Sequence, residues 1–248
     1  MTQNMNYSIV TGSRAYGLHN EKSDKDMLSV WTAPLEDRLK LYGKPKEVCH
    51  SDVAGVDVKE YELEKFFTMT FMKPSVNAIE FLYTNEVYIT TPLFEYIREH
   101  RALILHQMQW KSMKGQMLNM LDSAQKHLDK NNPSAAGKET ASAMRVYQIA
   151  SDIHGGLDPV INLEKGLPNF CSLLRKVKFN ETSKELQGRV TSLSERIQDE
   201  LPIKQEYWKE MPREIDKDAV NKLFIDCINK FDVNGDKLAT IKSRFYKV

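Results

Sequence analysis

A short segment near the N-terminus, GSRAYGLHNEKSDKD at residues 12–26, combines residue types that suit phosphate and metal chemistry. Gly12 permits a close approach of backbone N–H groups to an anion, and Ser13 adds a hydroxyl donor. The carboxylates Asp24 and Asp26 are two positions apart, and this spacing puts both on one face of an extended segment. Carboxylate oxygens are the ligands that Mg²⁺ prefers. The segment therefore predicts a triphosphate cradle beside a Mg²⁺ or Mn²⁺ site.

Displacement at phosphorus with two divalent ions normally requires a third carboxylate, which holds the ion that activates the attacking hydroxyl. Asp57, on the third predicted strand, is the first candidate for this role. Glu60 is the alternative if the strand register differs by one residue and a bulge intervenes. We therefore predict Asp24, Asp26 and Asp57 as catalytic metal ligands, and the choice between Asp57 and Glu60 stays open at this point.

Strands are expected on both sides of the segment. Residues 7–11 (YSIVT) and 27–32 (MLSVWT) are short β-branched runs, and residues 55–61 (GVDVKEY) alternate in the manner of a third strand. Residues 62–72 then change to helical spacing and end before a proline. The order strand, loop, strand, strand, helix predicts an α+β beginning with a small mixed sheet.

Helices dominate the remainder of the predicted structure. Ser75 is a predicted helix cap, Thr91-Pro92 opens another helix, and Asn131-Asn132-Pro133 separates two long amphipathic helices that read as a hairpin. The helices expected after the sheet are residues 75–83, 92–101, 113–129, 135–154, 169–177, 180–198 and 216–231. We expect two domains: residues 1–105 carry the metal site, and residues 106–248 form an α-helical C-terminal domain.

The composition is that of an ordinary globular protein with no overall attraction for polyanions. The 248 residues include 35 basic and 34 acidic side chains, so any nucleic-acid or phosphate site must be a local patch. Three widely separated cysteines form no Cys-x-x-Cys pair, which favours a reducing cytosol over a disulfide scaffold. No secretory signal and no apolar run of about 18 residues is present. We expect a cytoplasmic protein without a membrane partner.

The Gly-Ser, spacer, Asp-x-Asp pattern resembles the polymerase-beta nucleotidyltransferase superfamily. Three blocks, GSRAYGLHNEKSDKD, DVKEYELEKFFTMTFMKPSVNAIEFLY and GKETASAMRVYQIASDIHGG, are similar to a group of predicted nucleotidyltransferases found in bacteria and their viruses. The resemblance covers roughly residues 7–178. One departure is Lys25, which separates the two aspartates where the superfamily more often has an apolar or aromatic residue.

The resemblance implies a nucleotidyltransferase core followed by a helical domain, with Mg²⁺ or Mn²⁺ as the cofactor. The implied activity transfers a nucleoside monophosphate from a nucleoside triphosphate such as ATP to an acceptor hydroxyl, with release of pyrophosphate. It implies that Gly12 and Ser13 contact phosphates and that Asp24, Asp26 and Asp57 bind metal. An RNA end, a protein hydroxyl and a small molecule all remain open as acceptors.

Three further charged residues match positions of the same group: Glu80, Lys138 and Arg145. Lys138 and Arg145 lie seven residues apart on one predicted helix face, so we predict them as nucleotide-binding residues that pair with phosphates. Arg14 and Lys22 flank the predicted phosphate loop. Because charged residues in a polar loop are usually solvated, we leave both outside the predicted site.

Other chemistries find less support in the sequence. The six histidines show no metal-binding spacing, and no Ser-His-Asp arrangement is evident. The alternative from a different class is a non-catalytic nucleotide-binding protein or an antitoxin-like interaction protein, since a fold can be kept without its activity. That alternative predicts nucleotide binding without release of pyrophosphate.

Overall fold

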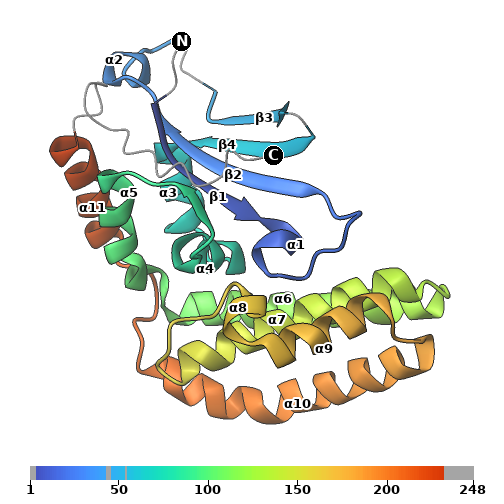
Figure 1. Cartoon of the computed structure of the whole chain (residues 1–248). Coiled ribbons are helices and arrows are strands. Elements are labelled where there is room, and N and C mark those ends of the chain that lie inside the picture. Colours follow the sequence, from blue (N-terminus) through green and yellow to red (C-terminus); the bar gives the residue numbers. More distant parts are fainter. Residues whose placement is uncertain (1–3, 43–45, 54, 232–248) are drawn as a thin grey trace. The chain divides into compact units, whose positions relative to one another are not determined.

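The chain forms one five-stranded mixed sheet and a set of long helices, as a computed structural model shows for residues 4–42, 46–53 and 55–231 (Figure 1). It divides into two compact units. The sheet unit comprises Met1–Ile104 together with Ile215–Val248, and the helical unit comprises Leu105–Glu214. The expected α+β class, with a mixed sheet followed by helices, is confirmed.

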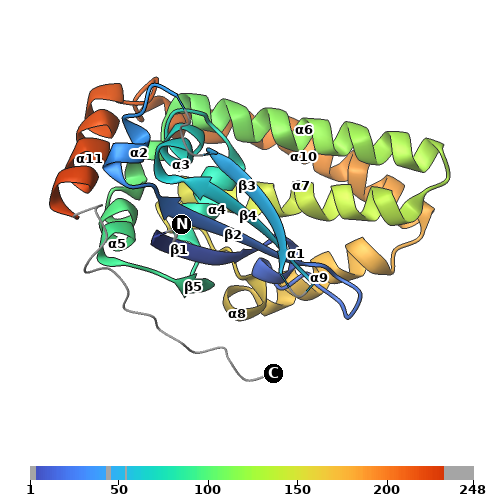
Figure 2. The same cartoon turned by 90° about the horizontal axis from the view of Figure 1, so that it is seen from above.

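The strands of the sheet lie in the order β3-β4-β2-β1-β5 (Figure 2). Their bounds are β1 Asn4–Thr11, β2 Lys25–Thr32, β3 Val48–Val53, β4 Val56–Glu62 and β5 Val87–Ile89. β2 and β4 pair in parallel, whereas the other neighbours are antiparallel. The end of β1 and the starts of β2 and β4 therefore meet at the same edge of the sheet.

One face of the sheet carries the aromatic and aliphatic side chains of its core. Tyr7, Ile9, Leu28 and Val30 share this face by register and are almost fully buried. The ring of Tyr7 stacks on Phe94, with centroids 3.5 Å apart. Three helices follow the strands of this core: α3 Leu63–Thr70, α4 Val76–Tyr83 and α5 Pro92–Glu99. This packing fixes the strands that carry the candidate site.

Side-chain caps start these helices where the sequence predicts them. The Ser75 hydroxyl accepts a hydrogen bond from the Ala78 N–H at 3.2 Å, and the Thr91 hydroxyl accepts one from Phe94. Both predicted helices are confirmed, although α5 ends at Glu99 and a 3₁₀ turn occupies Arg101–Ile104.

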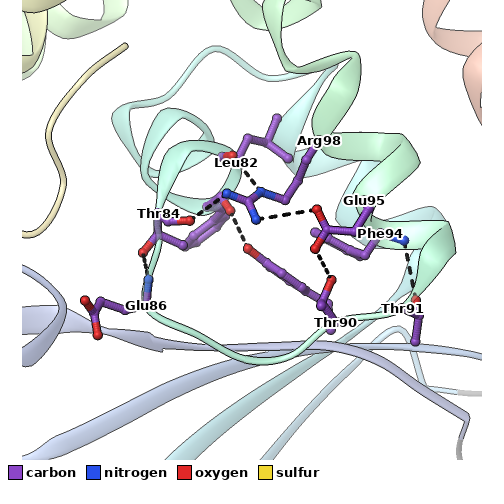
Figure 3. A network of polar contacts seen from close by, with 10 residues as sticks. Leu82, Thr84, Glu86, Thr90, Thr91, Phe94, Glu95 and Arg98 are labelled. Carbon is purple, nitrogen blue, oxygen red and sulfur yellow. Dashed lines mark hydrogen bonds and ion pairs between the residues drawn. The ribbon is translucent and has the colours of Figure 1, made fainter. Parts of the chain in front are cut away.

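Arg98 links α5 to the C-terminal end of α4 (Figure 3). Its Nε donates to the Leu82 carbonyl at 3.2 Å, and its Nη2 donates to the Thr84 carbonyl at 2.9 Å. Both carbonyls lie at the C-terminal end of α4, where the carbonyl groups have no hydrogen-bond donor within the helix. The Tyr7 hydroxyl donates to the Phe81 carbonyl of the same helix. Polar bonds thus tie α4 to both α5 and β1.

The helical unit contains a long antiparallel hairpin, visible as α6 and α7 in Figure 2. Asn131 adopts a left-handed φ of 55°, and the Asn132 side chain accepts a hydrogen bond from Ala135, so the predicted breaker both ends one helix and starts the next. The helices of this unit are α6 Gln107–Asp129, α7 Pro133–His154, α8 Leu163–Gly166, α9 Pro168–Phe179 and α10 Ser183–Lys209. The predicted hairpin is confirmed.

Close backbone packing joins α7 to α9. A Cβ placed on Gly137 would lie 2.6 Å from the carbonyl oxygen of Val177, so a glycine is required at this approach. In the described part of the chain, no helix combines the length and the apolar character that crossing a lipid bilayer requires.

Several elements differ from those expected. The strands β3 and β5 and the short helix α2, Leu35–Arg38, were not predicted. The helix α11, Lys217–Lys230, belongs to the sheet unit, whereas the expected C-terminal domain included residues 216–231. Phe224 of α11 contacts Phe67 edge-on at 5.0 Å, and the Arg38 guanidinium lies 5.5 Å from the Phe224 ring centroid. These contacts are distant in sequence, so local spacing did not reveal them.

The role of Arg98 predicts a large loss of stability when its charge is removed. Arg98→Met keeps the apolar stem but leaves the Leu82 and Thr84 carbonyls without these donors, so we expect the free energy of unfolding to fall by about 2–4 kcal/mol. Urea unfolding followed by circular dichroism measures the change. Lys73→Met, at an exposed lysine next to α4, is the matched control and should change stability by less than about 0.5 kcal/mol. Equal effects of the two changes would contradict the assigned role.

Candidate metal and phosphate site

Two aspartates lie side by side at the sheet edge where β1 ends and β2 and β4 begin. Asp26 of β2 pairs in register with Asp57 of β4, and neighbouring residues in register project from the same face of a sheet. Glu60 pairs with Ser29 instead, three positions further along β4, and therefore lies on the opposite face. The register favours Asp57 over Glu60 as the neighbour of Asp26.

Asp24 lies in the loop that leads into β2, and Arg14 fixes the backbone of that loop. The Arg14 Nε donates to the Asp24 carbonyl at 3.1 Å, and its Nη2 donates to the Ser23 carbonyl at 3.0 Å. Arg14 therefore makes specific hydrogen bonds within the protein, and its place outside the phosphate site stays a prediction. Side-chain to main-chain bonds of this kind leave no mark in sequence spacing, which is why the sequence analysis missed this role.

The charges of Asp24 and Asp57 act on the Asp26 carboxylate. Burial raises the pKa of Asp26 above its usual value, the negative charges of Asp24 and Asp57 raise this pKa further, and Arg14 opposes them. Like charges at close range disfavour ionisation, and a cation placed among them would remove that penalty. The electrostatics of this edge therefore favour the binding of a cation.

Gly12 lies against the Asp26 carboxylate. Its φ is +65°, a left-handed conformation that glycine adopts without strain, and a Cβ at this position would lie closer than 3.0 Å to the Asp26 Oδ2. Both the backbone conformation and the lack of space require glycine. The residue thus brings the main chain of the Gly-Ser turn within contact distance of a candidate metal ligand.

The Gly-Ser turn is a single helical turn, α1, at Gly12–Ala15. Four residues are too few to build a substantial helix dipole, so this turn does not present a strongly positive helix end to a phosphate. The first amides of a helix lack internal partners, and the Thr11 side chain makes no capping hydrogen bond. The contact of this turn with phosphate therefore stays a prediction that rests on N–H groups rather than on a helix dipole.

A tyrosine that the sequence analysis did not select anchors the end of this turn. The Tyr16 hydroxyl donates to the Oε2 of Glu80, a residue of α4 that is 5% exposed. A buried carboxylate requires hydrogen-bond partners, and Tyr16 supplies one to Glu80, so this bond links the end of the turn to α4. The signal available in the sequence was an acidic residue within the apolar face of a predicted helix.

The oxygen donors at this edge suit Mg²⁺ or Mn²⁺, although they do not form a closed cage. Within residues 4–42, 46–53 and 55–231, no three His, Cys, Asp or Glu side chains gather closely enough to hold an ion by themselves. Mg²⁺ commonly binds through one or two carboxylates and completes its shell with water and substrate phosphates. Asp26 and Asp57 lie side by side at this edge. They fit an ion that is bound partly by these carboxylates and partly by water and the oxygens of a triphosphate.

Lys138 and Arg145, the other predicted nucleotide-binding residues, lie on α7 in the helical unit. Lys138 is exposed, whereas Arg145 is 8% exposed. Burial lowers the pKa of Lys178, and the neighbouring charge of Lys138 lowers it further. Lys138 and Lys178 are therefore neighbouring positive charges. The binding of phosphate by Lys138 and Arg145 stays a prediction.

Comparison with known proteins identifies one family. The model of the RlaP family, described as the RNA repair pathway DNA polymerase beta family, matches residues 2–226. Among solved structures, the chain is similar to a nucleotidyltransferase-like protein from Exiguobacterium sibiricum 255-15, with 11% sequence identity and a TM-score of 0.39. That similarity covers 82% of this chain and 72% of the other. No curated protein sequence matches the chain significantly.

The repulsion around Asp26 predicts that a neutral replacement stabilises the metal-free protein. The raised pKa means that the favourable contribution of this carboxyl is present below the usual aspartate pKa and is lost as pH rises through the raised value. At neutral pH and in EDTA, Asp26→Asn should therefore unfold at a higher temperature than the wild type. At pH 3 the difference should shrink. A lower unfolding temperature at neutral pH would show that the carboxylate is stabilised rather than strained.

The contact between Gly12 and Asp26 predicts that Gly12→Ala impairs ligand binding, an effect that backbone strain alone does not cause. Gly12→Ala introduces both the left-handed strain and a collision with Asp26, whereas Gly55→Ala, at φ +78° with open space around its Cβ, introduces the strain alone. Both variants should lose roughly 1–2 kcal/mol of stability. We further predict that Mg²⁺ and a nucleoside triphosphate together raise the unfolding temperature of the wild type and of Gly55→Ala, but not that of Gly12→Ala.

Proposed function

The chain belongs to the RNA repair pathway DNA polymerase beta family, and on that premise we propose that it is a divalent-metal-dependent nucleotidyltransferase acting on RNA ends. The observation that carries the proposal is the edge of the sheet unit where Asp26 pairs with Asp57 and Gly12 contacts Asp26. Paired carboxylates next to a glycine-led turn suit a metal-bound triphosphate.

In the proposed reaction, the acceptor hydroxyl oxygen attacks the α-phosphorus of a nucleoside triphosphate. A new oxygen–phosphorus bond forms, the bond between the α-phosphorus and the bridging oxygen breaks, and pyrophosphate leaves with that oxygen. The proton of the acceptor hydroxyl passes to solvent water. Asp24, Asp26 and Asp57 would hold Mg²⁺ or Mn²⁺, which when bound lowers the pKa of an attacking hydroxyl and neutralises charge on pyrophosphate.

The chain's own residues would orient the reactants. We assign phosphate contacts to the N–H groups of the Gly12-Ser13 turn and to the Ser13 hydroxyl. Tyr16, held by Glu80, would keep that turn in place. Lys138 and Arg145 of α7 are proposed phosphate partners. Removing the charge of each residue in turn tests the two assignments separately.

An RNA end is the acceptor that the family description favours. The near-zero net charge of the chain suits a terminus, which needs few phosphate contacts, better than a long nucleic-acid track. We propose a cytoplasmic location, where nucleoside triphosphates are supplied and the free thiols of Cys49, Cys171 and Cys227 stay reduced.

The test is transfer of label from α-labelled nucleoside triphosphates to short RNAs that differ in their 3′ ends, with pyrophosphate release measured in parallel. We expect Mg²⁺- or Mn²⁺-dependent transfer that requires a free 3′ hydroxyl. Asp24→Asn and Asp26→Asn should each reduce it at least roughly 100-fold. Label that enters protein or small molecules instead would contradict the RNA acceptor. Nucleotide binding without any pyrophosphate release would replace the enzyme with a nucleotide-binding protein.

The strand register predicts which carboxylate completes the site. Asp57→Asn should abolish turnover to a similar extent as Asp26→Asn, because both side chains start from the same face. Glu60→Gln, on the opposite face of β4, is the matched control and should keep most of the activity. The measurement is the rate of pyrophosphate release at saturating nucleotide. The reverse ranking of the two variants would reject Asp57 as a ligand.

A further inference from the structure

The helical unit contains a cavity of about 740 Å³ that no part of the proposed reaction uses. It lies between α7, α9 and α10, which are neighbours in the helical bundle (Figure 1). All of its lining residues belong to the helical unit, so neither the aspartates nor Gly12 contributes to it. Sites for small organic ligands usually occupy about 300–1,000 Å³, so the volume suits one such molecule.

The lining combines an apolar wall with cationic side chains. The apolar and aromatic residues that line the cavity are Met144, Tyr147, Phe170, Leu173 and Leu193. Aromatic rings offer flat faces on which a planar ligand stacks with a substantial gain in free energy. The same cavity is also lined by Lys176, Arg189 and Arg196. A ligand that matches both groups has an apolar planar part and a negative charge.

The acidic residues of the cavity are already paired within the protein. The Glu181 side chain is 1% exposed and accepts bonds at 2.7 and 2.6 Å from the Arg189 Nε. The Glu185 carboxylate accepts bonds from the N–H and the hydroxyl of Thr182, both at 2.8 Å, and so caps the start of α10. Three cationic side chains, Lys176, Arg189 and Arg196, face these two carboxylates, so the lining keeps an excess of one positive charge.

Glu181 also orients the arginine that it binds. Both bonds use Nε, the inner nitrogen of Arg189, so this carboxylate leaves the two terminal nitrogens uncommitted. A guanidinium held in this way presents its remaining donors in a fixed direction, which suits recognition of phosphate oxygens. Arg196 lies over one face of the Tyr147 ring, 5.2 Å from its centroid, so this arginine covers that face and forms part of the aromatic wall.

We propose that this cavity binds a nucleoside monophosphate unit, with its base against the aromatic wall and its phosphate at Arg189 and Arg196. The unit can come from a free nucleotide or from the terminal nucleotide of an RNA strand, because both present the same base and phosphate. The site goes beyond the proposed reaction, since it needs neither the aspartates nor a divalent ion.

Gly188 of α10 permits a test that preserves the fold. It lines the cavity, and a Cβ at this position meets nothing within 4 Å. Gly188→Leu should therefore extend into the cavity, and because leucine favours a helix more than glycine does, the unfolding temperature should rise by about 2–4 °C. Gly115→Leu is the matched control. Gly115 lies in α6, outside the cavity lining, and its Cβ position is equally open.

The experiment uses the full chain with Asp24→Asn and Asp26→Asn in EDTA, so that binding at the metal site does not contribute. Calorimetric titration with AMP, GMP, CMP and UMP should show saturable one-site binding. Gly188→Leu should weaken it at least about tenfold, a change of about 1.4 kcal/mol, while Gly115→Leu should leave it unchanged. Absence of saturable binding, or equal binding by both leucine variants, would overturn the proposal.

A charge variant and a ligand control test the two parts of the proposed ligand. Arg196→Gln should weaken binding about tenfold, whereas Lys184→Gln, at an exposed lysine of α10 outside the cavity, should not. Inorganic phosphate should bind far more weakly than AMP, because it lacks the base. Equal binding of phosphate and AMP would reject the stacking role of the aromatic wall.

The source of the nucleotide is decided by comparing AMP with a tetraribonucleotide in the same titration. Tighter binding of the oligonucleotide identifies an RNA terminus, and equal or tighter binding of AMP identifies a free nucleotide. Both ligands must lose affinity in Gly188→Leu. Because this binding is measured without a divalent ion and without turnover, it can succeed or fail independently of the nucleotidyl transfer proposed above.

Discussion

The parallel pairing of β2 with β4 is the constraint on which the candidate site depends. It is the one parallel contact in the described sheet, and it brings Asp26 and Asp57 onto the same face at the same edge. A slip of one residue would turn one of these carboxylates to the other face. The mutual repulsion of the carboxylates opposes this arrangement, so the rest of the sheet unit must hold it in place.

The stabilising contacts lie away from the carboxylates. The stack of Tyr7 on Phe94 and the bonds of Arg98 to the end of α4 fix the helices against the strands. From α4, Glu80 binds Tyr16 and so reaches the turn that begins at Gly12. A packed aromatic core thus supports a polar edge at which like charges lie close together.

The features that could be predicted from the sequence are those that short-range residue patterns determine. The Gly-Ser turn, the caps at Ser75 and Thr91 and the breaker before α7 depend on neighbouring residues, and each was located from sequence. It did not decide between Asp57 and Glu60, because that choice depends on strand register. The bond between Tyr16 and Glu80 joins residues 64 positions apart, and no local periodicity encodes such a partner. The cavity lined by α7, α9 and α10 was missed for the same reason.

The position of α11 affects the order in which the protein can be completed during synthesis. The helical unit is inserted in the sequence between Ile104 and Ile215, and Phe67 and Arg38 receive Phe224 from beyond that insertion. Ribosomes add roughly 5–20 residues per second, so the emerging sheet unit waits on the order of ten seconds for its last helix. During that interval the apolar surface around Phe67 is uncovered, and a molecular chaperone would have its best opportunity to bind the nascent chain.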